Sequence, residues 1–143
     1  MAVTAWTAES AVKGATQKKV VAKELTRTQI VQYAGASGDF NPLHTDEVFS
    51  KAIAGYPSVF AHGMLSMGAT GTLVTDAFGV ENLTGYGVRF RSQVWPGDTL
   101  TATVTITDVA RHQAHTTVTA TVETVNQKGD VVVSGTATAD LPH

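Results

Sequence analysis

The chain has 143 residues, of which 43% are hydrophobic and 15% are charged. This length fits a single domain over residues 1–143, and the composition excludes a disordered protein, which combines low hydrophobicity with high charge. Ten basic and twelve acidic side chains give a net charge of −2, which excludes a general nucleic-acid binder with a basic stripe.

Cysteine is absent from the sequence. Its absence excludes disulfide bonds, thiolate zinc sites and cysteine nucleophiles. No apolar run approaches the roughly 20 residues that a membrane-spanning helix needs. Residues 1–7 also lack the basic and apolar segments of a secretory signal. We therefore expect a cytoplasmic protein that does not contact a membrane.

The first part of the chain predicts a strand followed by a helix. Residues 1–16 show no sustained period and predict a loose N-terminal arm, and residues 18–25 predict a strand. Thr26-Arg27-Thr28-Gln29 matches a capping box, in which the threonine caps a helix and the glutamine reaches back to it. This helix should end near Gly35 or Gly38. Its expected buried side comprises Ile30, Val31 and Ala34.

Two further helices are predicted before the middle of the chain. Thr45-Asp46-Glu47 offers a capping hydroxyl and two acids, which indicates the start of a short helix. The expected buried face of this short helix comprises Phe49, Ala52 and Ile53. Residues 62–78 are helical again but contain Gly68 and Gly71, each costing about 1 kcal/mol relative to alanine. Such a cost is accepted where another element, such as a surrounding sheet, must approach the helix closely.

The second half of the chain predicts antiparallel strands. Threonines alternate with apolar side chains over residues 99–107 and 117–122, which is the period of a half-buried strand. Residues 86–94 predict a further strand, and residues 131–141 predict the last one after a turn at residues 128–130. A helix-rich half followed by an antiparallel meander is an α+β arrangement.

The segment Ser37-Gly38-Asp39-Phe40-Asn41-Pro42-Leu43-His44 brings together an acid, an amide and an imidazole. Asp39 and Asn41 could cap backbone groups in a loop between helices. Alternatively, Asp39 and His44 could carry general acid–base chemistry. A calcium loop does not fit, because its sixth position is His44 rather than glycine and Pro42 interrupts it.

A second informative segment, Phe60-Ala61-His62-Gly63-Met64-Leu65, stands at the start of the glycine-bearing helix. The first turn of a helix offers unpaired N–H groups and a positive dipole end. Gly63 has no side chain to keep a ligand away from its N–H, so it is a candidate oxyanion donor. The alternative is an ordinary glycine near a helix cap. Met64 could contact an acyl chain or belong to the core.

Together these two segments resemble the MaoC-like hydratase/dehydratase family. The pattern Ser-Gly-Asp-x-Asn-Pro-x-His is followed further along the chain by Ala-His-Gly-Met, and Val88-Arg89-Phe90 with Val94-Trp95-Pro96-Gly97-Asp98 extends the resemblance over residues 18–141. The resemblance implies the hot-dog fold, in which an antiparallel sheet wraps a long central helix. It also implies hydration of trans-2-enoyl thioesters, or dehydration of (3R)-hydroxyacyl thioesters, in fatty-acid metabolism.

The resemblance assigns roles to particular residues. Asp39 and His44 would be the catalytic pair that holds one water, and which of them takes its proton stays open. The N–H of Gly63 would bind the thioester oxygen, and Asn41 would orient the loop. Some relatives carry a serine two turns after this glycine, where this chain has Gly71. Two further candidates for substrate binding or orientation are His62 and Met64. The chemistry needs a base, an acid and an oxyanion donor, but no metal or other cofactor.

The expected partners are an acyl-CoA or acyl-carrier-protein substrate and a second copy of the chain. Acyl length, carrier and physiological direction stay open. Low charge and long threonine-faced edge strands predict a homodimer or a dimer of dimers, because such edges pair with other chains.

Two other functions compete with the hydratase interpretation. A hot-dog thioesterase would need an acid on the long helix, whose first acid is Asp76 near its end. A non-catalytic subunit of a heterodimeric dehydratase could lose Asp39 or His44, and this chain keeps both. His112 and His115 are three residues apart on a predicted strand, so they should point to opposite faces and form no metal site.

Overall fold

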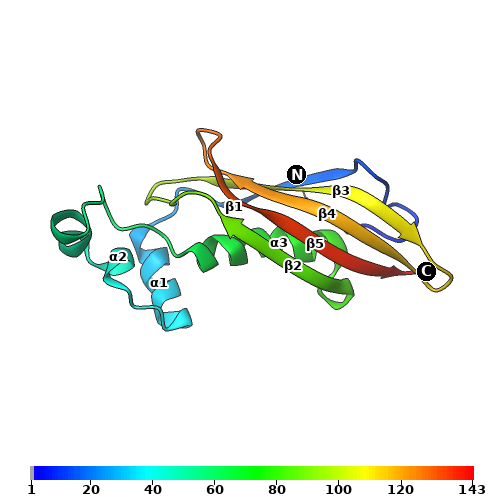
Figure 1. Cartoon of the computed structure of the whole chain (residues 1–143), viewed down its shortest axis with the longest axis horizontal. Coiled ribbons are helices and arrows are strands. Elements are labelled where there is room, and N and C mark those ends of the chain that lie inside the picture. Colours follow the sequence, from blue (N-terminus) through cyan, green and yellow to red (C-terminus); the bar gives the residue numbers. More distant parts are fainter. Residues whose placement is uncertain (1) are drawn as a thin grey trace.

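The computed structural model describes residues 2–143 and contains a five-stranded antiparallel sheet with the order β1-β3-β4-β5-β2. A long helix, α3 (Gly63–Phe78), lies along the sheet, and a lobe of short helices extends beyond one end of it (Figure 1). This is the α+β arrangement that the residue patterns predict, and it is the hot-dog fold that the resemblance implies. The strands are β1 (Thr16–Ala22), β2 (Leu83–Phe90), β3 (Leu100–Arg111), β4 (His115–Val125) and β5 (Val131–Pro142).

The core lies between α3 and the inner face of the sheet. Alternate residues of the strands are buried against the helix, while the threonines between them face outward, which confirms the predicted period of two. The helix contributes its own apolar stripe to the same cluster. The largest fully buried side chains of this cluster are Phe78, Leu73, Ile106, Leu141, Val74, Val104 and Val118.

Helix α1 (Arg27–Ser37) begins and ends at the predicted signals. Thr26 Oγ1 accepts a hydrogen bond from the Gln29 N–H at 3.0 Å, and Gln29 Oε1 accepts one from the Thr26 N–H at 2.9 Å. Gly38 ends the helix with a left-handed φ of 75°, a conformation that glycine adopts without steric cost. The capping box is confirmed. Val31 is exposed, so its predicted burial is wrong, because only one narrow side of α1 meets the rest of the chain.

The segment after α1 forms α2 (Pro42–Thr45) and then a π-helical turn, η1 (Phe49–Ile53), at the tip of the lobe (Figure 1). Asp46, rather than the predicted Thr45, caps the second turn by accepting from the Phe49 N–H at 3.0 Å. Of the predicted buried face, Phe49 is half-buried, but Ala52 and Ile53 are exposed, so the prediction is wrong for these two. Ser50 is buried, whereas Ile53 is 73% exposed, because the sheet does not reach the tip of the lobe.

The N-terminal arm is packed rather than loose. Residues 2–15 form no helix or strand, yet Ala8 and Ala11 are fully buried in the main core cluster. The Trp6 ring lies 5.2 Å from the Phe78 ring, and the main-chain N–H of Trp6 donates to the Ala77 carbonyl at 2.8 Å. The expectation of a loose arm is therefore wrong. Small side chains packed against the end of α3 leave no periodic signal in the sequence.

Two strand predictions need correction. β2 begins and ends earlier than the predicted 86–94, and the chain from Arg91 onward forms a loop toward β3. His112 and His115 do not point to opposite faces, because β3 ends at Arg111 and both histidines close a hairpin. The His112 N–H donates to the His115 carbonyl at 2.9 Å, and the two rings lie 4.7 Å apart.

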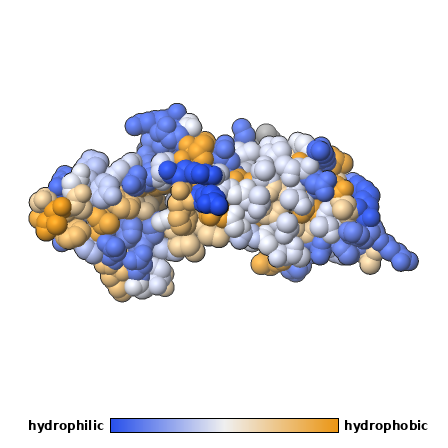
Figure 2. Space-filling model, viewed as in Figure 1, coloured by the Kyte–Doolittle hydropathy of each residue, from blue (hydrophilic) through white to orange (hydrophobic). Residues whose placement is uncertain are grey.

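Apolar side chains are exposed on the lobe. Figure 2 shows hydrophobic surface at the tip of the lobe. Val48, just before η1, and Ile53, at its end, are exposed. Within residues 2–143, no helix is both long enough and apolar enough to cross a membrane.

Candidate active site

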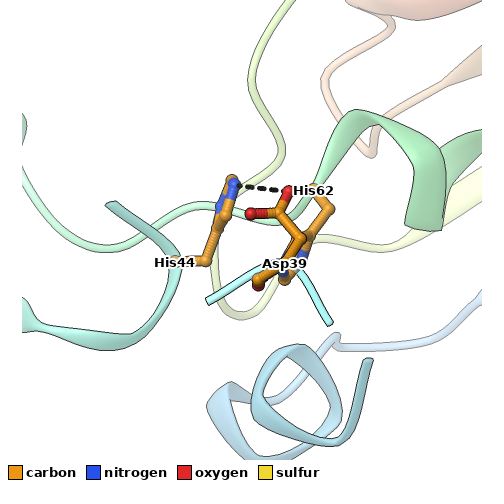
Figure 3. A group of neighbouring side chains, drawn as sticks. All are labelled: Asp39, His44 and His62. Atoms are coloured by element: carbon orange, nitrogen blue, oxygen red, sulfur yellow. Dashed lines mark hydrogen bonds and ion pairs between the residues drawn. The ribbon is translucent and has the colours of Figure 1, made fainter. Parts of the chain in front are cut away.

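Asp39 is held by the turn that follows α1. Its N–H donates to Ser37 Oγ at 3.2 Å, and its Oδ1 accepts from the Asn41 N–H at 3.2 Å. The second oxygen, Oδ2, lies 4.0 Å from His44 Nε2 (Figure 3). The Asp39 side chain is 54% exposed and that of His44 is 11% exposed. An accessible carboxylate therefore faces a nearly buried imidazole.

His44 is oriented by the backbone of the second sequence motif. Its Nδ1 lies 2.5 Å from the carbonyl oxygen of Phe60. A carbonyl oxygen can only accept, so Nδ1 carries the hydrogen of the neutral ring. The lone pair of Nε2 is then turned toward Asp39. In this tautomer Nε2 can accept a proton from a water held between the two side chains.

His62 joins the two halves of the site. Its ring, only 2% exposed, stacks on the His44 ring with centroids 3.8 Å apart and an interplanar angle of 27°. Its Nε2 donates to the Asp39 carbonyl oxygen at 3.0 Å, and the edge of Tyr33 packs against it. Nδ1 of His62 is buried without a hydrogen-bond partner in the described chain. His62 therefore fixes both the main chain of Asp39 and the plane of His44.

Asp39, His44 and His62 could each offer one ligand atom to a metal, since these atoms lie within 4.8 Å of one another. The orientation of the rings does not suit a shared ion. Ring lone pairs lie in the ring plane, and the planes of the two stacked rings are 27° apart with centroids separated by 3.8 Å, so the lone pairs lie in separate planes and not in a common one. One nitrogen of each ring is hydrogen-bonded to a carbonyl oxygen, so the only ring atoms left for an ion are His44 Nε2 and His62 Nδ1, in the two stacked planes. The donor set does not fit a metal centre.

Gly63 opens the first turn of α3, next to this cluster. No side chain among residues 2–143 caps that turn, so its N–H groups remain available to an anionic oxygen. A Cβ at Gly63 would lie 2.9 Å from the ring of Phe90, so only glycine fits without displacing that ring. A cavity of about 260 Å³ reaches this point and is lined by Phe60, Ala61, Gly63, Phe90, Arg91, Ser92 and Gln93.

Two further candidates occupy different environments. Asn41 uses its side chain within the loop, where Oδ1 accepts from the Leu43 N–H at 3.0 Å and caps α2. Met64 is exposed, so it does not belong to the core. The sequence did not point to Phe60 as a functional residue, because it acts through its carbonyl group. A backbone acceptor leaves no side-chain signature.

The site and the fold agree with the comparisons with known proteins, which identify a MaoC-like domain. The family model described as MaoC like domain matches residues 9–128, and the chain belongs to this family. An (R)-specific enoyl-CoA hydratase from Rhodospirillum rubrum is 33% identical over 133 residues, which cover 88% of this chain and 86% of the relative. The solved (R)-hydratase of Aeromonas caviae superimposes with a TM-score of 0.81 at 28% identity, covering 94% of this chain and 100% of that one.

Other relatives are much longer than this chain. 3-Hydroxyacyl-thioester dehydratase Y of Mycobacterium tuberculosis is 36% identical over 78 residues, which are 52% of this chain but 27% of the relative. The chain thus spans about a quarter of the length of some curated relatives that it matches. The family resemblance and the hot-dog fold predicted from the sequence are confirmed.

Proposed function

We propose that this protein is a hydro-lyase that reversibly hydrates trans-2-enoyl thioesters and dehydrates (3R)-hydroxyacyl thioesters in fatty-acid metabolism. The observation that carries the proposal is the Asp39–His44 pair, with 4.0 Å between carboxylate and imidazole, beside the uncapped start of α3. The names of the relatives support the same reaction class and the (R) configuration.

The proposed reaction uses one water held by Asp39 Oδ2 and His44 Nε2. One of the pair takes a proton from the water, and the water oxygen forms a bond to C3 of the enoyl group. The π electrons move to the thioester oxygen, where the N–H of Gly63 stabilises the developing negative charge. A proton from the catalytic pair is then added to C2, so one water is added across the double bond. The reverse order of steps removes it.

Three other side chains support this chemistry in the proposal. Asn41 holds the loop between Asp39 and His44 by capping α2. His62 holds the His44 ring by stacking on it, and it holds the main chain of Asp39 by a hydrogen bond to the Asp39 carbonyl. Exposed Met64, next to Gly63, offers apolar surface to the substrate. All the groups that the reaction needs come from the chain, so we propose that it uses no metal or other cofactor.

The partners that we propose are an acyl-CoA or acyl-carrier-protein substrate and a second copy of the chain, in a homodimer or a dimer of dimers. The expectation of threonine-faced edge strands is wrong, because the threonine-rich β3 and β4 lie inside the sheet. The edges are β1 and β2, and unpaired edges favour association. Large apolar side chains are also exposed, as expected for a covered surface: Phe40, Val48 and Ile53. The sheet and core shared by residues 2–143 support the single domain that we propose for residues 1–143. A stable and fully active monomer in light scattering would contradict the dimer.

The test is an assay of the purified chain with enoyl-CoA thioesters of several lengths. We expect loss of the conjugated double bond with no release of free thiol. Release of thiol at the same rate would instead indicate a thioesterase. That function is disfavoured because the first acid of α3 after Gly63, Asp76, is bound by Lys19 at 2.6 Å. A non-catalytic subunit would show neither reaction.

A further inference from the structure

The carbonyl group that orients His44 belongs to a segment without regular structure. Residues 58–60 form no helix or strand, so their position depends on hydrogen bonds to neighbouring parts of the chain. Phe60 uses both of its main-chain groups on α2: its N–H donates to the Leu43 carbonyl at 3.2 Å, and its carbonyl oxygen accepts from His44 Nδ1. The placement of the His44 ring therefore depends on the placement of residues 58–60.

Two contacts flank this carbonyl group along the chain. After it, the Ala61 N–H donates to the Val94 carbonyl at 2.8 Å. Before it, the Val59 N–H donates to Glu47 Oε2 at 3.4 Å, and Ser58 Oγ donates to the same oxygen at 3.1 Å. Hydrogen bonds to a charged acceptor are stronger than those between neutral groups. The Glu47 carboxylate is therefore the side-chain group that holds the near end of the segment.

Two cations hold the Glu47 carboxylate in this position. Lys51 Nζ lies 3.1 Å from Oε1 and Arg27 Nη2 lies 3.4 Å from it, and Arg27 Nη2 also donates to Ser58 Oγ at 3.1 Å. These hydrogen bonds, that from Lys51 above all, lower the pKa of Glu47, so its oxygens stay charged near neutral pH. An exposed ion pair by itself contributes little to stability. Here, however, the second oxygen of the carboxylate binds the segment that orients His44.

Close packing does not fix residues 58–60 on this side. A cavity of about 300 Å³ lies against the segment and against the His44 ring. Its lining consists of Arg27, Val31, His44, Thr45, Glu47 and Val59. Side chains that border an unfilled space lack packing contacts on that side. The hydrogen bonds to Glu47 therefore carry the placement that packing does not supply.

We propose that Glu47 is a positioning residue for catalysis: its carboxylate holds residues 58–60 so that the Phe60 carbonyl keeps the hydrogen of His44 on Nδ1. The Nε2 lone pair then stays turned toward Asp39 and the proposed water. The inference rests on the proposed hydratase function. Without the carboxylate, one end of the segment is released and the carbonyl is free to move away from Nδ1. The ring can then carry its hydrogen on Nε2, which removes the lone pair that faces the water.

The test measures kcat and KM with crotonyl-CoA, Tm, and the ¹⁵N NMR signals of the His44 ring at a pH at which the ring is neutral. These signals report which nitrogen carries the hydrogen, and His44→Gln, which lacks them, assigns them. Since a misplacement of about 1 Å can cost about 10²-fold in rate, Glu47→Ala should lower kcat at least about tenfold with KM nearly unchanged. Its His44 signals should show hydrogen on both nitrogens.

Two further variants make the comparison decisive. Glu47→Met keeps the length of the side chain but has neither carboxylate oxygen, so it should behave like Glu47→Ala and decides the matter if that variant does not fold. Asp76→Ala is the matched control, because it also removes a carboxylate paired with a lysine, Lys19, at 2.6 Å, but near the far end of α3. The control should keep the wild-type kcat and His44 signals.

The NMR signals separate this inference from the proposed reaction, because they are measured without substrate. In a wild type that hydrates crotonyl-CoA, a folded Glu47→Ala or Glu47→Met variant that keeps either kcat or the His44 signals overturns the inference, and so do equal losses in Asp76→Ala. A wild type that hydrates no enoyl-CoA refutes the reaction. In that case a shift of the His44 hydrogen in the Glu47 variants still supports the placement by Glu47, and unchanged signals overturn it. A wild type with the hydrogen on Nε2 overturns it as well.

Discussion

Replacing Asp39 and His44 singly and together separates a catalytic role from a structural one. Asp39→Asn keeps Oδ1, which accepts the 3.2 Å hydrogen bond from the Asn41 N–H, so the turn should survive. The substitution removes the negative charge and the proton acceptor at Oδ2, which faces His44 Nε2 across 4.0 Å. His44→Gln removes that ring nitrogen and the stack on His62. Each substitution thus removes one of the two groups, the Asp39 carboxylate or the His44 imidazole, that hold the proposed water.

The expected magnitude follows from these contacts. Loss of a positioned proton-transfer group costs about 10²–10⁴-fold in rate, so we expect each single variant to lose about 10³-fold in kcat, which corresponds to about 4 kcal/mol of barrier. Because both groups act on one water, the double variant should be little worse than either single one. Independent roles would instead multiply to about 10⁶-fold.

The assay measures kcat with crotonyl-CoA and Tm on the same preparations. Asp46→Asn is the matched control, since Asp46 also accepts a backbone hydrogen bond, from the Phe49 N–H at 3.0 Å, but lies outside the site. We expect the control to keep both kcat and Tm. An Asp39→Asn variant that melts early but turns over at nearly the wild-type rate would show that Asp39 only caps a loop, and would refute the catalytic role.

Three further changes test the fold and its electrostatics. Thr26→Ala removes the capping box of α1 and should cost about 1 kcal/mol of unfolding free energy; differential scanning calorimetry should show a lower Tm, and an unchanged Tm would contradict the cap. Gly63→Ala places a Cβ 2.9 Å from the Phe90 ring and should lower kcat about 10²-fold by displacing the substrate, whereas normal turnover would exclude Gly63 from the site. The hydrogen bond from Lys51 is the main cause that lowers the pKa of Glu47 to about 2 from 4.5. The stabilisation from this pairing is therefore present above pH 4.5 and lost as the pH falls toward 2. Titration of Glu47 by NMR should show the low midpoint and its rise in Lys51→Ala; equal midpoints would contradict the pairing.

Local chemistry explains which parts of the fold could be predicted from the sequence. The capping box at Thr26 depends on neighbouring residues, so its sequence signal was sufficient. The end of α1 was predicted near Gly35 or Gly38, and the left-handed conformation at Gly38 decides between them. The strands of the second half follow from the alternation of threonine with apolar side chains. Residues 2–15 were mispredicted because Ala8 and Ala11 become buried only when the arm meets α3 and the sheet. Burial of small side chains at irregular spacing has no local pattern.

The candidate site likewise combines residues that the sequence indicates with contacts that arise only in the folded chain. Asp39, His44 and Gly63 could be singled out because their residue types and motifs fit the chemistry. The stack of His62 on His44 could not, since it depends on two chain segments meeting in the folded protein. The hydrogen bond from His44 to the Phe60 carbonyl is equally hidden, because any residue supplies a carbonyl. The tautomer of His44 therefore emerges only from the three-dimensional structure.

The configuration of the alcohol formed from crotonyl-CoA by the purified wild-type chain is the most direct test of the proposed function. We expect (3R)-3-hydroxybutanoyl-CoA, formed at a rate that a metal chelator leaves unchanged, because Asp39, His44 and Gly63 supply the groups that the reaction needs. Chiral chromatography of the hydrolysed product measures the configuration. The (3S) alcohol, a rate abolished by the chelator, or no alcohol at all would contradict the account.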